Sequence, residues 1–144
     1  MIYVASSWRN TYYPGVVALL RQEGFTLYDF RHPAPGDNGF HWSEIDPAWE
    51  QWTPQAYREA LRHPLATHGF RNDMTALRAC DTLVLVLPCG RSAHLELGYA
   101  IGAGKRTIIY YPPGIHMEPE LMYKAADHLC LSTLELLDVH GVKD

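Results

Sequence analysis

The stretch "GRSAHLELGYAIGAGK", residues 90–105, places one carboxylate in an otherwise apolar helical segment, where Glu96 stands between Leu95 and Leu97. A charged carboxylate in apolar surroundings is costly unless another group pairs with it or a reaction uses it. The structural alternative is an acid at a helix start, favoured by the helix dipole or by a capping box. A capping box needs the acid three residues after Ser92, and Leu95 occupies that place. The spacing therefore favours a functional carboxylate.

The start of the same stretch carries residue types that suit a turn and an anion. Gly90 allows a sharp turn, and Ser92 is expected to cap a helix that begins one residue later. Arg91, Ser92 and His94 cluster where free backbone N–H groups favour an anion such as a phosphate. Alternatively, Ser92 only caps the helix while Arg91 and His94 point into water. On the functional interpretation, these residues and Gly90 bind substrate.

Apolar runs and segments of helical spacing alternate along the chain, and these elements must position the chemistry. Strands are predicted at 2–6, 25–31, 81–88, 106–112 and 128–132. Helices are predicted at 13–23, 54–62, 71–79, 92–103, 119–127 and 132–139. This alternation predicts a single α/β domain over residues 1–144, flavodoxin- or Rossmann-like. We expect a mainly parallel five-stranded sheet in the order 2-1-3-4-5, with helices on both faces. Gly98 and Gly102 are expected to let their helix pack closely on the sheet.

In such a sheet, ligands gather at the carboxyl ends of the strands where the strand order reverses. That crevice lies between "ASSWRN" and "PCGRSAHLE". Ser6 and Ser7 are candidates to contact a sugar or a phosphate, or they cap the following helix. Trp8 is a candidate to stack on a base, or it packs. The long irregular segment 32–54 is expected to be functional or partly helical.

The run "CDTLVLVLPCGRSAHLELGYAIGAGK" resembles the central motif of nucleoside 2-deoxyribosyltransferases and of the related deoxynucleotide N-hydrolases. The resemblance implies that Glu96, in "ELGYA", is the catalytic nucleophile. It also implies that Tyr3, in "MIYVASSW", orients this nucleophile, although a tyrosine in a strand commonly only packs. Asp73, in "FRNDMTAL", matches an aspartate that touches the base. Its alternative role is an N-cap for a helix at 74–79.

The segment "EPELMYKAAD" resembles a late family segment that reaches into a neighbouring subunit's site. This implies that Glu120 and Met122 contact substrate, and that the chain forms a homo-oligomer, from dimer to hexamer, with shared active sites. The chain also departs from the family pattern. Gly90 stands where the transferases usually carry an aspartate, and Glu120 stands where they carry an amide. In the hydrolases, a serine of the Gly-rich turn contacts a 5′-phosphate, and Arg91 and Ser92 offer similar donors.

Composition limits the classes of partner. The net charge of −4 argues against nucleic acid and against anionic membranes as partners. The resemblance implies a nucleoside or nucleotide and a free nucleobase as the small-molecule partners. Three cysteines without a CxxC pair favour a reducing compartment, and we find neither a signal peptide nor an apolar run long enough to span a membrane. The predicted localisation is cytoplasmic. No histidine or cysteine spacing suggests a metal site, and no cofactor is expected.

Three functions are compatible with these patterns. The favoured one is transfer of deoxyribose between nucleobases through a covalent glycosyl–glutamate intermediate. The first alternative is hydrolysis of the same N-glycosidic bond, in a nucleoside or in its 5′-monophosphate. The second is a non-catalytic nucleotide-binding or signalling module on the same fold.

Overall fold

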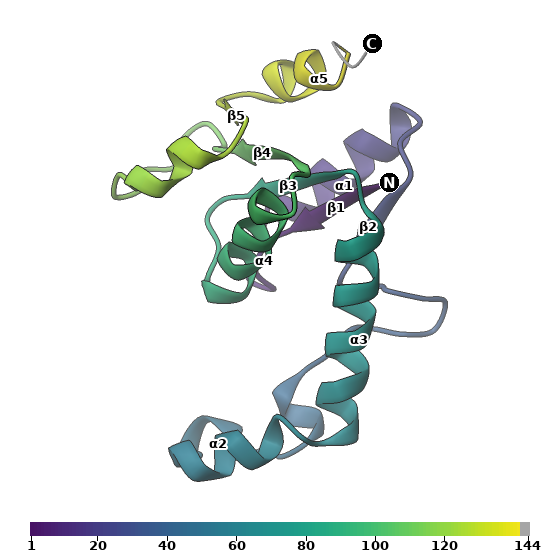
Figure 1. The fold of residues 1–144 in the computed structure, drawn as a ribbon, viewed down its shortest axis with the longest axis vertical. Helices are drawn as coiled ribbons and strands as arrows, with labels where there is room; N and C mark the ends of the chain where they lie inside the picture. The colour runs from purple at the N-terminus through teal and green to yellow at the C-terminus, as the bar shows by residue number, and fades with distance from the viewer. Residues whose placement is uncertain (142–144) are drawn as a thin grey trace. The chain divides into compact units, whose positions relative to one another are not determined.

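The structure, a computed structural model, describes residues 1–141, which form two compact units. The first unit contains residues 1–29 and the chain from residue 79 onward, and the second contains residues 30–78. Each unit is described by itself below (Figure 1). The single domain over residues 1–144 stays a prediction. In the described part of the chain, no helix is both long and apolar enough to cross a membrane.

The first unit is built on a parallel sheet whose five described strands run in the order β2-β1-β3-β4-β5. The strands are β1 (Ile2–Ala5), β2 (Leu27–Asp29), β3 (Thr82–Val86), β4 (Arg106–Tyr110) and β5 (His128–Cys130). Each strand is shorter than its predicted run, because the apolar runs include residues that lead into and out of the sheet. The topology confirms the predicted flavodoxin-like α/β fold.

Helices α1 and α4 cover opposite faces of the sheet. The helices of this unit are α1 (Tyr13–Gln22), α4 (Arg91–Gly102) and α5 (Thr133–Gly141). Successive strand residues point to opposite faces. Tyr3 of β1 reaches Glu96 of α4. Asp29 of β2 is the register partner of Val4, the next residue of β1, and its carboxylate accepts from Tyr13 of α1 at 2.8 Å. All residues of β1 and β3 are buried, in agreement with cover on both faces.

Two predictions about α4 are wrong. The helix begins at Arg91 with Gly90 as its N-cap, so Ser92 lies inside the first turn and does not cap it. Gly90 is extended, with φ −95° and ψ −154°, so helical geometry starts directly after it. Gly98 and Gly102 are exposed, and a Cβ added at either would meet nothing within 4 Å. The buried face of α4 is instead made of Ala93, Leu97 and Ala100.

The second unit contains η1 (Trp42–Glu44), η2 (Trp49–Gln51), α2 (Pro54–Ala60) and most of α3 (Pro64–Ala79). The two short 3-10 helices confirm that the segment 32–54 is partly helical. Helix α3 begins seven residues before its predicted start. The N-cap interpretation of Asp73 is therefore wrong, because this residue lies inside the helix. Phe40 packs on Gly69 in the earlier turns, where a Cβ would come within 2.8 Å of Phe40 Cβ.

The segment predicted as a helix at 119–127 is shorter and tighter than expected. It forms the 3-10 helix η3 (Leu121–Ala125) between β4 and β5. The Glu120 carboxylate caps η3 by accepting from the backbone N–H of Met122 at 2.7 Å. Leu121 and Met122 are 79% and 69% exposed, so they contribute no buried face that would extend the helix.

Candidate active site

The carboxyl ends of β1 and β3 are joined by buried polar side chains. Ser6 Oγ donates to the carbonyl oxygen of Val86 at 2.8 Å. Asn10 Nδ2 donates to the same oxygen at 3.1 Å and to the carbonyl oxygen of Pro88 at 3.0 Å. These bonds give the backbone carbonyls at the end of β3 donors that they need once buried. The strand order reverses here, so the topology agrees with the place at which the sequence predicts a ligand crevice.

Glu96 and Tyr3 meet at this crevice. The Tyr3 phenol donates a hydrogen bond to Glu96 Oε2, although 93 positions separate the two residues. Tyr3 is fully buried and Glu96 is half-buried. The Tyr3 ring also stacks on Tyr28 of β2, with ring centroids 5.2 Å apart. A fixed phenol that donates to a carboxylate favours the ionised form and offsets part of the cost of burial.

Cys89 lies beside Glu96 in the turn after β3. Burial raises the pKa of its thiol to about 12, and the negative charge of Glu96 adds to the rise. A cysteine with such a pKa carries almost no thiolate near neutral pH, and the thiolate is the nucleophilic form. Of the two side chains, Glu96 is therefore the better candidate nucleophile.

Besides the bond from Asn10 to Pro88, a second hydrogen bond connects the turn from β3 to α4 with the segment after β1. The Gly90 N–H donates to Ser7 Oγ at 2.7 Å. Arg91 and Ser92 are exposed at the start of α4, and Trp8 is 41% exposed after β1. The predicted substrate contacts of these side chains stay predictions.

His94 is held on both sides of its ring. Its Nδ1 lies 2.7 Å from the carbonyl oxygen of Gly90, and its Nε2 lies 2.7 Å from the Tyr123 hydroxyl. Both nitrogens thus have partners in the protein itself. Direct contact of His94 with substrate stays a prediction, and it would have to replace or share these bonds.

The remaining predicted site residues are placed as follows. Glu120 and Met122 are exposed on η3 in the first unit. Asp73 is half-buried on α3 in the second unit, and its contact with a base stays a prediction. Within the first unit, the structure thus brings Tyr3 and Glu96 together directly.

Most of the loop aromatics of the second unit pack on one another. Trp42 makes edge-to-face contacts with the rings of Phe40, Trp52 and Tyr57, at centroid distances of 4.7, 5.7 and 6.0 Å. Trp52 Nε1 donates to Asp46 at 2.7 Å. These contacts are typical of a small core, so the geometry supports a packing role for these rings.

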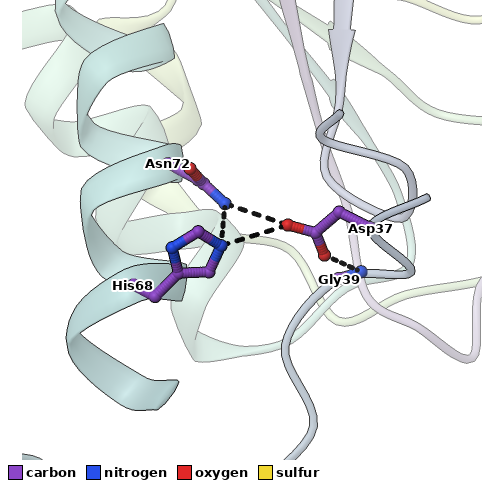
Figure 2. Close-up of polar contacts among 4 residues, drawn as sticks. All are labelled: Asp37, Gly39, His68 and Asn72. Atoms are coloured by element: carbon purple, nitrogen blue, oxygen red, sulfur yellow. Dashed lines mark hydrogen bonds and ion pairs between the residues drawn. The ribbon is translucent and has the colours of Figure 1, made fainter. Parts of the chain in front are cut away.

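A polar cluster in the second unit joins its first loop to α3 (Figure 2). Asp37 Oδ2 lies 3.2 Å from His68 Nε2 and 3.3 Å from Asn72 Nδ2, while Oδ1 accepts from the Gly39 N–H at 2.9 Å. The Gly39 bond, followed by the His68 contact, lowers the pKa of Asp37. Because His68 is largely exposed, the cluster is best explained as a loop anchor.

Two surface hollows are lined by residues other than Tyr3 and Glu96. One, of about 360 Å³, lies at the amino end of β4 against Lys105, Arg106 and Asp127. The other, of about 370 Å³, lies in the second unit between Asp46 and His63. Both are open and neither touches Glu96, so the chemistry of the crevice outweighs their size as a guide to the site. In the described residues, no group of three or more His, Cys, Asp or Glu is placed to hold a metal ion.

Sequence reasoning missed four residues around the crevice: Asn10, Tyr28, Cys89 and Tyr123. Asn10 carries a detectable signal, because an Asn after a strand commonly caps the next helix. Its Oδ1 accepts from the N–H groups of Tyr12, which is the N-cap of α1, and of Tyr13, the first residue of the helix. The other three depend on contacts between distant elements, which leave no local signal.

Comparison with protein-family models gave no match, and comparison with curated protein sequences gave no significant match.

Proposed function

We propose that this chain cleaves the N-glycosidic bond of a 2-deoxynucleoside and transfers the sugar to a second nucleobase. The observation that supports this most strongly is the hydrogen bond from buried Tyr3 to Glu96 at the carboxyl ends of β1 and β3. It gives a half-buried carboxylate a fixed orientation at the edge of the sheet where ligands bind. The resemblance of "HLELGYA" to the transferase motif supports the same reaction class.

The proposed reaction has two displacement steps. Tyr3 holds Glu96 Oε2, so Oε1 attacks the anomeric carbon and forms an ester. The C–N bond breaks, its electron pair leaves with the base, and the base takes up a proton. Asp73 is the proposed donor. A second base then attacks the same carbon, its N–H proton passes to the Asp73 carboxylate, the carbon–oxygen bond breaks, and its pair returns to Glu96. Two inversions give net retention at the sugar.

Hydrolysis of a nucleoside 5′-monophosphate is the second candidate. It is supported by the start of α4, where Gly90 provides no side-chain cap and where Arg91 and Ser92 are exposed. Backbone N–H groups of a first turn together with an arginine suit a phosphate. In this reaction water takes the place of the second base.

Assembly and location are part of the proposal. Exposed apolar side chains occur on η3, on edge strand β5 and from there to the start of α5, and they support a homo-oligomer. These side chains are Leu121, Met122, Leu129, Leu131 and Leu134. In the described residues, Cys80, Cys89 and Cys130 form no disulfide, which supports the proposed location in a reducing compartment, the cytoplasm.

The test is incubation with a deoxynucleoside, or with its 5′-monophosphate, in the presence and absence of a second free base, followed by chromatography. A new nucleoside supports transfer, and free base alone supports hydrolysis. Glu96→Gln should lower turnover by several orders of magnitude, and Tyr3→Phe by about 10²-fold. Tyr99→Phe, which removes an exposed phenol from α4, is the matched control and should behave like wild type. Binding without turnover, unaffected by Glu96→Gln, would instead indicate a non-catalytic module.

A further inference from the structure

The segment η3 is attached to the crevice through Tyr123. This side chain is half-buried, whereas Leu121 and Met122, just before it, are largely exposed. The Tyr123 hydroxyl lies 2.7 Å from His94 Nε2, and the two rings are nearly parallel, with an angle of 15° and centroids 5.7 Å apart. This contact joins η3 to the first turn of α4.

His94 transmits this attachment to the strand ends. A carbonyl oxygen only accepts, so the 2.7 Å contact with the Gly90 oxygen requires the proton on Nδ1. In the neutral ring, Nε2 is then the acceptor, and the Tyr123 O–H donates to it. The Gly90 N–H in turn donates to Ser7 Oγ after β1. A continuous chain of hydrogen bonds thus runs from η3, through the start of α4, to the end of β1.

The surroundings keep the Tyr123 phenol in its donating form. Burial raises the pKa of Tyr123, and the charges of Cys89 and Glu120 add to the rise. Cys89 is the residue that also lies beside Glu96. His94 contacts both Tyr123 and Cys89, so the Tyr123 end of η3 is tied to the turn that contains Cys89. The phenol stays protonated over the pH range of ordinary assays.

We propose that Tyr123, through its hydrogen bond to His94, is a positioning residue that holds η3 at the mouth of the crevice containing Glu96. It acts on substrate affinity and leaves the chemical step almost unchanged, because Met122 in η3 and Glu120, the N-cap of η3, are the proposed contacts with substrate in the shared active sites. This inference rests on the proposed function for its effect on substrate. Its structural part, the attachment of η3 to α4, stands on the geometry of this unit.

The test combines hydrogen exchange with steady-state kinetics on the full chain. Tyr123→Phe keeps the ring and removes only the hydroxyl, and Tyr99→Phe is the matched control. We expect amide exchange in residues 120–126 to be about five- to tenfold faster in Tyr123→Phe, in line with the loss of one net hydrogen bond. KM for the deoxynucleoside should rise by a similar factor, while kcat changes less than twofold. His94→Gln, whose amide oxygen can still accept from the phenol, should show a smaller effect on exchange than Tyr123→Phe.

The two proposals fail in different ways. Exchange in residues 120–126 that is the same in Tyr123→Phe and wild type overturns the positioning role, whether or not turnover is seen. Faster exchange with unchanged KM, or a loss confined to kcat, overturns the link to substrate affinity. Wild-type protein that neither binds nor converts a deoxynucleoside contradicts the proposed function and the kinetic part of this inference. The exchange result still decides whether Tyr123 attaches η3 to α4.

Discussion

The Cys89 thiol should react about a thousandfold more slowly than an ordinary cysteine at pH 8, and Glu96 should contribute to this difference. Its pKa of about 12 lies about three units above the usual 9.0. Well below both values, each unit lowers the thiolate fraction tenfold, so three units give roughly 10³-fold. The rate of alkylation by iodoacetamide follows the thiolate fraction. Mass spectrometry of the Cys89 peptide, in folded and in urea-unfolded protein, measures the ratio.

Removing the charge of Glu96 separates the two causes. Burial is the larger cause and Glu96 the smaller one, so Glu96 contributes less than half of the shift. Glu96→Gln should therefore speed alkylation of Cys89 by less than about 30-fold. Cys130 provides an internal reference, because its pKa is raised by burial and then by Glu135. Glu135→Gln should speed the alkylation of Cys130 and leave the alkylation rate of Cys89 unchanged. Equal Cys89 rates in wild type and Glu96→Gln would refute a charged carboxylate beside the thiol.

The same shift makes stability depend on pH. The pKa of Cys89 is higher in the folded protein than in the unfolded one. The contribution of the neutral thiol to the free energy of unfolding is therefore fully present below pH 9 and is lost as pH rises from 9 toward 12. The linkage relation gives about 1.4 kcal/mol at pH 10, and we expect about 1 kcal/mol because the thiol is only half-buried. Urea unfolding of wild type and Cys89→Ala at pH 7 and pH 10 should show a smaller loss in the variant. Parallel losses would contradict the raised pKa.

Three further predictions concern the scaffold. Gly98→Ala should raise the free energy of unfolding by about 1 kcal/mol, because the position is helical with open space around it. Gly69→Ala should instead lower the free energy of unfolding by about 1–3 kcal/mol, because the added Cβ overlaps with Phe40. Urea titration measures both variants, and changes of the same sign would contradict the geometry. Asn10→Ala should cost about 3 kcal/mol in the same assay, because the side chain makes four hydrogen bonds at the strand ends, and a cost below about 1 kcal/mol would show that these bonds are dispensable. The folded-state pKa of Asp37 is lowered, so its contribution to stability is present above its usual pKa and is lost as pH falls through the lower value. The free energy of unfolding of Asp37→Asn should therefore vary less between pH 5 and pH 2 than that of wild type. Identical pH dependence of the two proteins would contradict the shift.

Local patterns in the sequence determined the architecture. In the run "DTLVLVLP", residues 83–87 are all apolar and do not alternate with polar residues. This pattern is typical of a strand buried on both faces, and β3 is buried throughout. Alternation of such runs with helical spacing predicted a parallel sheet, and the order 2-1-3-4-5 then placed the crevice between β1 and β3. Glu96 could also be identified from the sequence, because it is a carboxylate among the apolar residues of its own helix.

Helix boundaries and close packing depended on tertiary contacts. Ser92 is a good capping residue in isolation, but the extended backbone at Gly90 starts α4 before it. Gly98 and Gly102 have a spacing that suits close packing, yet the helix is rotated so that Ala93, Leu97 and Ala100 face the core. Small differences in rotation and in starting residue leave almost no trace in sequence periodicity.

The environment of Glu96 was decided by the tertiary structure alone. Tyr3 reaches Glu96 because β1 and α4 pack together across 93 positions of chain. Cys89 lies beside it, and His94 contacts both Cys89 and Tyr123, because the turn after β3 and the segment η3 converge at the start of α4. The sequence determines residue types and local periods, since these act between near neighbours. Burial, pKa and hydrogen-bond partners depend on which distant elements meet, and only the folded chain brings them together.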